Sequence, residues 1–343
     1  MQIDFSCFSL ENLKPQNEFE CKVVGFLQEW FSDCKTLWVQ TSGSTGIPKT
    51  IEVEKQKMLN SAKMTCDFLG LEEGNSALLC LPVEYISGKM MLVRAMERKL
   101  NIRIESPSAQ PLKNLTESLA FCAMTPLQVQ NSLDKIHLIK NLIIGGAEVS
   151  ENLKRAIKQV FSKESQPSSS QIFETYGMSE TLSHIALKQI FPIEEDYFSS
   201  LEGIDISVDE RSCLRISAPK LNAETLQTND IVELKGKKQF RFLGRFDYVI
   251  NSGGVKIFPE EIESLVKQHI PNEVVFIGKK DEILGEKLVL LIEGNEDENV
   301  KSIISKINFR HKFHVPKEII FVEKFPRTAN AKISRLALKE MIL

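Results

Sequence analysis

The chain has 343 residues, of which 42% are hydrophobic and 26% are charged, and its formal net charge at pH 7 is -3. This length allows two or three domains with a substantial core. A weakly acidic chain without an apolar run long enough to cross a bilayer is not expected to bind nucleic acid or to span a membrane.

The seven cysteines are scattered along the chain and show no C-x-x-C spacing. This pattern is typical of reduced thiols and disfavours a zinc site or a disulfide framework. The first residues carry neither a basic region nor a long apolar run, so no signal peptide is expected. Together these features predict a cytoplasmic location.

Apolar residues recur at helical spacing from Phe19 to Phe31, and β-like runs at 37–40 and 50–53 enclose the segment 41–49. That segment reads Thr-Ser-Gly-Ser-Thr-Gly-Ile-Pro-Lys. Its glycines allow backbone N–H groups to approach an anion, its hydroxyls donate hydrogen bonds, and its lysine supplies a counter-charge. We interpret it as a strand-loop-strand site for a polyphosphate rather than as a flexible polar turn. The residues expected to contact phosphate are Thr41, Ser42, Gly43, Ser44, Thr45, Gly46 and Lys49.

Helical and β-like stretches alternate as far as residue 161. Helices are predicted at 55–69, 89–100, 126–133 and 150–161, with β-like runs at 77–81, 102–104, 120–124 and 142–144. This alternation predicts an α/β sheet covered by helices. Between residues 204 and 242 the apolar period changes to two, which predicts a small, mostly antiparallel β subdomain.

The last part of the chain has a compact α+β pattern of its own. Helices are predicted at 259–269, 299–307 and 334–342, and strands at 274–277, 288–292 and 318–322. The acidic residues in the first of these helices are predicted to face solvent. We place the domain boundary at Gly-Arg-Phe-Asp, residues 244–247, which divides the chain into domains 1–245 and 246–343.

Several stretches, in order, resemble the motifs of the adenylate-forming superfamily, which includes acyl-CoA synthetases, luciferases and peptide-synthetase adenylation domains. The segment 41–49 resembles its phosphate-binding signature, and residues 176–181, Tyr-Gly-Met-Ser-Glu-Thr, resemble its Tyr-Gly-Met-Thr-Glu-Thr motif. The resemblance implies that Ser179 contacts the α-phosphate of ATP and that Glu180 helps to hold Mg²⁺, as oxygen ligands suit a hard cation. It also implies a nucleotide site that includes Gly145, Gly146, Ala147, Tyr176 and Gly177.

Residues 228–230, Thr-Asn-Asp, resemble the Thr-Gly-Asp motif, with Asn229 in place of glycine. By this resemblance the carboxylate of Asp230 accepts hydrogen bonds from the ribose hydroxyls. Arg245 is likewise implied to reach the nucleotide sugar. Asp247 takes the position of the hinge between the two domains.

Two further motifs fall in the second domain. Residues 251–257 resemble the segment just past the hinge, and adjacent Gly253 and Gly254 allow a tight turn there. In the thioester-forming conformation of the superfamily this segment faces the active site. Residues 326–332, Pro-Arg-Thr-Ala-Asn-Ala-Lys, resemble Pro-Arg-Thr-x-x-Gly-Lys. The resemblance implies that Lys332 is catalytic and bridges the substrate carboxylate and the α-phosphate.

The chain is short, as if the start of the first domain were trimmed. In this respect, and in the sequences Leu-Pro-Val-Glu-Tyr-Ile-Ser-Gly at 81–88 and Ser-His at 183–184, it resembles the o-succinylbenzoate–CoA ligases of bacterial menaquinone synthesis. Tyr85 stands where those ligases have histidine. Lys89 or Arg94 is a candidate partner for a second carboxylate, although Arg94 is equally readable as a solvated helix charge. His184 is a candidate for the acyl pocket or a hydrogen-bonded histidine on a strand.

The resemblance implies an AMP-forming acid–CoA ligase that takes a small carboxylic acid, ATP with Mg²⁺, and CoA as co-substrate. Residues 1–245 would bind ATP and the acid, and residues 246–343 would form a mobile lid that carries Lys332. Three alternatives remain open: an enzyme that loads a carrier-protein thiol, a ligase for another aryl or fatty acid, and a catalytically lapsed nucleotide-binding protein. The last is suggested by Ala331 and Asn229, which replace glycines.

Overall fold

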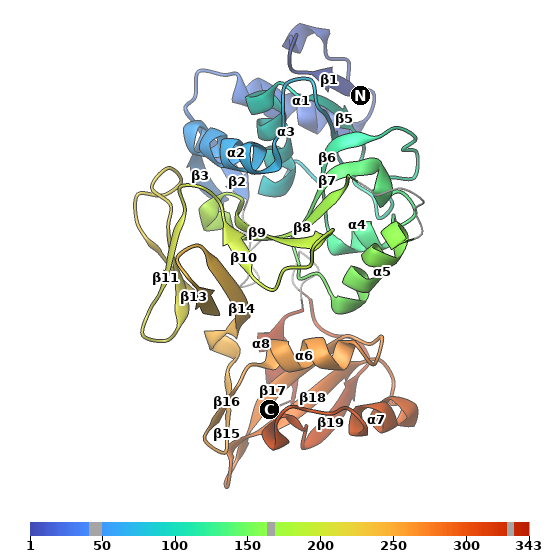
Figure 1. The fold of residues 1–343 in the computed structure, drawn as a ribbon, viewed down its shortest axis with the longest axis vertical. Helices are drawn as coiled ribbons and strands as arrows, with labels where there is room; N and C mark the ends of the chain where they lie inside the picture. The colour runs from blue at the N-terminus through green and yellow to red at the C-terminus, as the bar shows by residue number, and fades with distance from the viewer. Residues whose placement is uncertain (41–49, 163–168, 328–332, 343) are drawn as a thin grey trace.

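The computed structural model of the chain describes residues 1–40, 50–162, 169–327 and 333–342. Figure 1 shows two bodies of unequal size, a larger one drawn in blue to yellow and a smaller one in orange to red. Each body has its own sheet and its own buried hydrophobic clusters. Among the described residues, no helix combines the length and apolar character that crossing a membrane requires.

A twelve-stranded sheet forms the larger body, in the order β1-β5-β4-β6-β7-β8-β9-β10-β14-β13-β12-β11. Its strands are β1 (Gln2–Asp4), β4 (Ser76–Leu79), β5 (Asn101–Ile104), β6 (Leu119–Met124), β7 (Ile139–Ile144), β8 (Gln171–Gly177), β9 (His184–Phe191), β10 (Phe198–Ser200), β11 (Asp205–Val208), β12 (Cys213–Ser217), β13 (Leu226–Lys235) and β14 (Gln239–Arg245). Strands β5, β4, β6, β7 and β8 pair in parallel, and the remaining pairs are antiparallel.

Helices cover both faces of the parallel half of this sheet. They are α1 (Glu18–Trp30), α2 (Lys55–Leu69), α3 (Ile86–Arg98), α4 (Pro126–Gln130) and α5 (Glu151–Ser162). Successive side chains of a strand point to opposite faces, so Leu79 joins the cluster with α1 to α3 and Leu78 the cluster with α4 and α5. Burial on both faces is what a parallel sheet requires. The predicted α/β fold is confirmed.

Strands β2 (Thr36–Gln40) and β3 (Thr50–Glu54) form a separate antiparallel pair. The two β-like runs predicted on either side of segment 41–49 are therefore present, while the segment itself lies outside the described residues. Strands β11 to β14 confirm the predicted antiparallel region. They continue the large sheet through the pairing of β10 with β14, so this region shares one sheet with the parallel strands.

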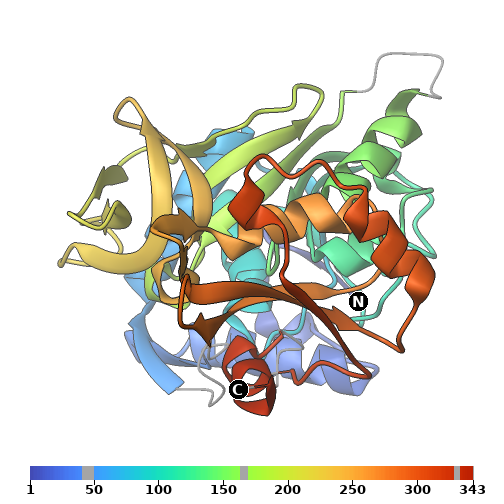
Figure 2. The same ribbon diagram turned by 90° about the horizontal axis from the view of Figure 1, so that it is seen from below.

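The smaller body has the order β16-β15-β18-β17, with β19 pairing in parallel with β18. Its elements are β15 (Ile250–Ser252), β16 (Val255–Ile257), α6 (Pro259–Lys267), β17 (Val274–Asp281), β18 (Gly285–Glu293), α7 (Glu298–Ser305), β19 (Glu318–Val322) and α8 (Arg335–Ile342). Helices α6 and α7 pack on one face of this sheet and α8 on the other, as Figure 2 shows. Since β14 and β15 lie in different sheets, this topology supports the division between residues 245 and 246, which remains a proposal.

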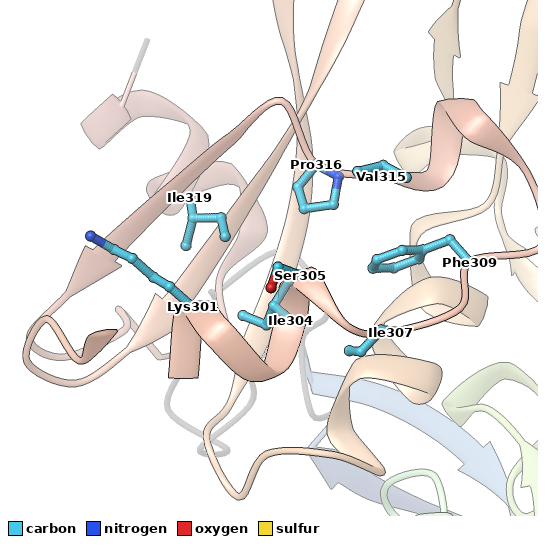
Figure 3. A pocket seen from close by; sticks show the side chains of 8 residues that line it. All are labelled: Lys301, Ile304, Ser305, Ile307, Phe309, Val315, Pro316 and Ile319. Atoms are coloured by element: carbon cyan, nitrogen blue, oxygen red, sulfur yellow. The ribbon is translucent and has the colours of Figure 1, made fainter. Parts of the chain in front are cut away.

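A cavity of about 200 Å³ opens in the smaller body beside α7 and β19. As Figure 3 shows, its lining is largely apolar: Lys301, Ile304, Ser305, Ile307, Phe309, Val315, Pro316 and Ile319. The Lys301 ammonium pairs with Glu296 and Glu298. None of the residues predicted to act in catalysis or binding lines this cavity.

The acidic residues of α6 differ from the prediction, because the helix lies between the sheet and the larger body. Glu261 is exposed and pairs with Arg310, as expected. Glu263 is buried, where its Oε1 accepts hydrogen bonds from Arg335 Nη1 at 2.8 Å and from the backbone N–H of Phe276 at 2.7 Å. The expectation of a solvated side chain was wrong for Glu263, because Arg335 comes from a distant part of the chain.

The expectation was also wrong for Glu260, which is half-buried against the end of β14. Its Oε1 accepts from the backbone N–H of Arg245 at 3.3 Å, and its Oε2 is buried without a partner among the described residues. Gly244 has φ +154°, and a Cβ there would lie 2.7 Å from Glu260 Oε2. Burial raises the pKa of Glu260 to about 7. A second contact between the bodies joins Asn152 Nδ2 to the carbonyl of Lys267 at 3.0 Å.

We expect Glu263→Ala to lower the free energy of unfolding by about 3 kcal/mol, because it leaves the partly buried Arg335 guanidinium without its carboxylate. Urea unfolding followed by circular dichroism measures this change. Glu261→Ala is the matched control, since it removes an exposed ion pair of the same helix and should cost less than about 1 kcal/mol. Equal losses in the two variants would show that the Glu263 pair is no more important than a surface contact.

The Glu260 carboxyl makes stability depend on pH. The native protein holds a proton on this group up to a pKa of about 7, above the ordinary value of 4.5, so the free energy of unfolding should fall as pH rises from about 5 to 7. Because part of the side chain reaches solvent, we expect a contribution on the order of 2 kcal/mol. Glu260→Gln should remove this slope in thermal unfolding measured at several pH values. An unchanged slope would exclude Glu260 as its source.

Candidate active site

The predicted nucleotide residues gather at the carboxyl ends of β7 and β8. These strands pair in parallel, with Ile144 opposite Glu174. Gly145 follows β7 and lies against β8, because a Cβ on Gly145 would be 2.5 Å from Thr175 Oγ1. The stretch 145–147 therefore lies beside the 176–181 motif. The carboxyl edge of parallel strands is where α/β sheets bind ligands.

Asp230 links this edge to the antiparallel half of the sheet. It lies in β13 opposite Arg245 of β14, and its side chain is buried. The hydroxyl of Tyr176 donates to Asp230 Oδ2 at 2.5 Å, and Arg245 Nη1 donates to Oδ1 at 3.3 Å. Burial, and then the charge of Asp230, raise the pKa of Tyr176 well above its usual value, so the phenol stays a donor. Three of the predicted nucleotide residues thus meet around one carboxylate.

Ser179 and Glu180 lie in the short 3-10 helix η3 (Ser179–Thr181), directly after β8. Thr181 is fully buried and fixes this turn, since its Oγ1 accepts from the N–H of Met178 at 3.0 Å and donates to the carbonyl of Ser183 at 2.7 Å. Ser179 is half-buried and Glu180 is exposed.

No group of three His, Cys, Asp or Glu side chains within the described ranges is placed to hold a metal ion. A single exposed carboxylate such as that of Glu180 suits Mg²⁺ that is bound mainly through phosphate oxygens and water. The chemistry of this residue therefore fits the predicted role. The role remains a proposal.

The remaining phosphate-contacting candidates, Thr41 to Lys49, and the catalytic candidate Lys332 lie outside the described residues. So does Ala331. The chain on either side of 328–332 is paired, with Arg327 bridged to Ile333 in antiparallel fashion. Arg327 Nη2 also donates to Glu293 Oε2 of β18 at 2.6 Å.

Arg94 of α3 is buried, with only 2% of its surface exposed. Its Nη2 donates to Ser183 Oγ at 2.6 Å, and its Nε has no partner among the described residues. No described carboxylate forms an ion pair with it. The alternative of a solvated helix charge is therefore wrong, and sequence reasoning missed the burial because a lysine or arginine in a helix is usually exposed.

His184 lies beside this guanidinium. Its Nε2 is 3.0 Å from Thr65 Oγ1, and its Nδ1 is 3.4 Å from Ser183 Oγ. Burial, followed by the charge of Arg94, lowers the pKa of His184 well below its usual value, so the ring is neutral. Thr65 and Ser183 are polar partners in this cluster that the sequence did not single out as site residues.

The other acyl-pocket candidates lie elsewhere on α3. Lys89 Nζ donates to the carbonyl of Trp38 at 3.0 Å and lies over the Phe26 ring. Tyr85 is half-buried at the N-terminus of the helix. Lys89 is also buried, and the choice between Lys89 and Arg94 as the partner of a second carboxylate is a proposal.

Gly253 and Gly254 form the tight turn between β15 and β16, with φ +57° and +79°. A Cβ on Gly253 would lie 2.7 Å from the Phe313 ring. In Figure 1, β15 and β16 run toward the lower end of the smaller body, away from the large sheet. The turn predicted to serve the thioester step therefore lies far from Tyr176 and Asp230 in this arrangement.

Comparisons with known proteins agree with these motifs. The family described as AMP-binding enzyme matches residues 37–206. A solved acyl-CoA synthetase (AMP-forming)/AMP-acid ligase II-like protein from Dyadobacter fermentans is 35% identical, covers 100% of this chain and 99% of its own, and superposes with a TM-score of 0.66. The 2-succinylbenzoate–CoA ligase of Listeria monocytogenes is 27% identical, over 94% of this chain and 73% of the relative.

The o-succinylbenzoate coenzyme A synthetase of Bacillus subtilis, solved with ATP and magnesium ion, shares the fold. Its TM-score is 0.74 at 20% identity, with 88% of this chain and 69% of that chain covered. The motif residues meet at one edge of the sheet, and the similarity to the Dyadobacter protein extends along both chains. The chain therefore belongs to the AMP-binding enzyme family, within the adenylate-forming superfamily of AMP-forming ligases.

Proposed function

We propose that this chain is an ATP-dependent acid–CoA ligase that converts 2-succinylbenzoate to 2-succinylbenzoyl-CoA. The observation that carries the choice of acid is the buried guanidinium of Arg94, which lies beside the motif that follows β8 and pairs with no carboxylate among the described residues. The relatives named 2-succinylbenzoate–CoA ligase support the same choice.

The reaction has two steps. In the first, the acid carboxylate attacks the α-phosphate of ATP and pyrophosphate leaves; in the second, the CoA thiol attacks the acyl-adenylate and AMP leaves. Segment 41–49 would hold the departing pyrophosphate, Ser179 would donate to the α-phosphate, and Glu180 would hold Mg²⁺, which neutralises phosphate charge. Lys332 would offset the negative charge that develops as two anions approach.

Asp230 is prepared to bind the ribose. Tyr176 and Arg245 each donate to one of its oxygens, and a carboxylate oxygen accepts more than one hydrogen bond. Two sugar hydroxyls can therefore donate to a carboxylate whose orientation is already fixed. Gly145 to Ala147, on the neighbouring strand end, would line the adenine.

Arg94 accounts for the second carboxylate of the acid. A buried guanidinium without a counter-charge is unfavourable by several kcal/mol, so an anion from a ligand would stabilise it. 2-Succinylbenzoate has two carboxylates, one to be activated and one free to pair with Arg94 in the bidentate geometry that arginine favours. The neutral ring of His184 adds no competing charge beside it.

Arg94→Gln tests this assignment. We expect kcat/KM for 2-succinylbenzoate to fall about 100-fold or more, because the charge-assisted pairing is lost in a buried site. The same variant should treat 4-oxo-4-phenylbutanoate, which lacks the ring carboxylate, much as the native enzyme does. The midpoint temperature of thermal unfolding should be unchanged or slightly higher, since an unpaired buried charge is removed. A parallel loss with both acids would exclude Arg94 from the recognition of the second carboxylate.

Lys332→Ala separates the two steps. We expect it to abolish ATP–pyrophosphate exchange while it still forms thioester from supplied acyl-adenylate and CoA, because the ammonium serves only the attack on phosphorus. Pyrophosphate release measures the first half-reaction, and thioester absorbance measures the second. An equal decrease in both would remove the role assigned to Lys332.

A pyrophosphate-release screen over aromatic, succinylated and fatty acids, with CoA present, decides among the remaining alternatives. Preference for 2-succinylbenzoate with CoA supports the proposal. Pyrophosphate release without CoA thioester, but with transfer to a holo carrier protein, indicates a carrier-loading enzyme. Nucleotide binding with no release for any acid indicates a lapsed enzyme.

A further inference from the structure

Residues 246–249 are the single passage of the chain between the two bodies, because β14 ends at Arg245 in the large sheet and β15 begins at Ile250 in the small one. This passage contains the 3-10 helix η4 (Phe246–Tyr248). Any rotation of one body against the other must change the backbone angles here. Contacts that hold these residues against the large sheet therefore restrain the rotation.

Asn229 makes such a contact. It lies in β13, and its side-chain Nδ2 donates to both carboxylate oxygens of Asp247, at 3.1 Å to Oδ1 and 3.3 Å to Oδ2. The only other donor to this carboxylate among the described side chains is Arg245, the residue that ends β14, whose Nη2 is 2.9 Å from Oδ2. Asn229 thus joins the passage to a neighbouring strand of the large sheet.

The amide of Asn229 is itself fixed. Arg211 Nη1 donates to Asn229 Oδ1 at 3.2 Å, and Arg211 Nε donates to Asp209 Oδ2 at 2.8 Å. The Arg211 guanidinium also lies 4.9 Å from the centre of the Phe246 ring. Only one orientation of the amide gives its oxygen a donor and its nitrogen an acceptor. These hydrogen bonds link Asp209 and Arg211 of the β11–β12 loop, through Asn229, to Asp247 in the passage.

We propose that Asn229 is a positioning residue that retains the two bodies in the present arrangement. It thereby slows their rotation into the arrangement that thioester formation needs. This inference rests on the proposed two-step function. In the present arrangement β15 and β16, which the turn at Gly253 and Gly254 joins, extend to the end of the smaller body away from the large sheet, so thioester formation requires a rotation about 246–249. The rotation moves Asp247 away from β13 and breaks its hydrogen bonds with Asn229, and bonds to a charged acceptor are among the stronger ones.

The side chain of Asn229 is a particular feature of this chain, since the motif it resembles has glycine at that position. Among the described residues, two other hydrogen bonds span the bodies, between Glu260 and Arg245 and between Asn152 and Lys267. Neither holds the passage itself. Replacing Asn229 by glycine or alanine therefore removes one restraint on the passage, while the ion pair of Arg245 with Asp247 and the contact of Arg211 with the Phe246 ring remain.

The test compares Asn229→Gly and Asn229→Ala with the native protein. Hydrogen exchange of the amides at 246–249, without any substrate, should become about three- to tenfold faster in both variants. Thioester formation from supplied acyl-adenylate and CoA should rise by a similar factor, while pyrophosphate release should stay equal or fall. Agreement between the two variants shows that the lost side chain, and not the flexibility of glycine, is responsible.

Asn222→Ala is the matched control, because Asn222 is also half-exposed and, among the described residues, its side chain bonds only to the nearby N–H of Glu224. This variant should change neither measurement. Native-like exchange in both Asn229 variants, or an equal decrease of both half-reactions, would overturn the inference. If the native protein forms no CoA thioester, the proposed function fails, and the exchange measurement still decides whether Asn229 restrains the passage.

Discussion

The carboxylate of Asp230 connects the parts of the molecule on which its chemistry depends. Tyr176 reaches it from the end of the parallel strands, and Arg245 reaches it from the strand that leads to the smaller body. Because both donors are fixed by strand pairing, the proposed sugar site lies where the parallel and antiparallel parts of the sheet meet. The antiparallel strands that follow β8 return the chain to this edge of the sheet. They place Asp230 of β13 beside the motif that follows β8.

Charge burial separates structural residues from those that serve a ligand. Glu263 is buried, Arg335 is partly buried, and the two side chains satisfy each other, so this ion pair needs no ligand. Arg94 is more deeply buried, but its neighbours Ser183 and His184 offer a hydroxyl and a ring nitrogen in place of a carboxylate. A buried charge that pairs with no carboxylate in the described part of the chain is the basis of the proposal that its partner arrives with the substrate.

The sequence was sufficient to predict most helices and strands. It was insufficient to predict the burial of several side chains. Helix α2 was predicted at 55–69 from its apolar spacing and ends there, because Gly70 takes φ +60° and stops it. The single sheet shared by parallel and antiparallel strands could not be predicted, since period-two patterns do not say which strand pairs with which. The burial of Arg94 and Glu260 was missed for a related reason: it depends on residues far along the chain, such as Ser183 and Gly244.

Arg245 spans two carboxylates with one planar group, since Nη1 contacts Asp230 and Nη2 contacts Asp247. A guanidinium is rigid, so its two ends cannot be displaced independently. Movement of the passage between the bodies therefore tilts the donor that orients Asp230, the carboxylate proposed to bind the ribose. Binding and domain orientation are thermodynamically linked. An arrangement of the two bodies that lowers the affinity for the nucleotide is therefore less populated while the nucleotide is bound. The Arg245 side chain would thus couple nucleotide affinity to domain orientation.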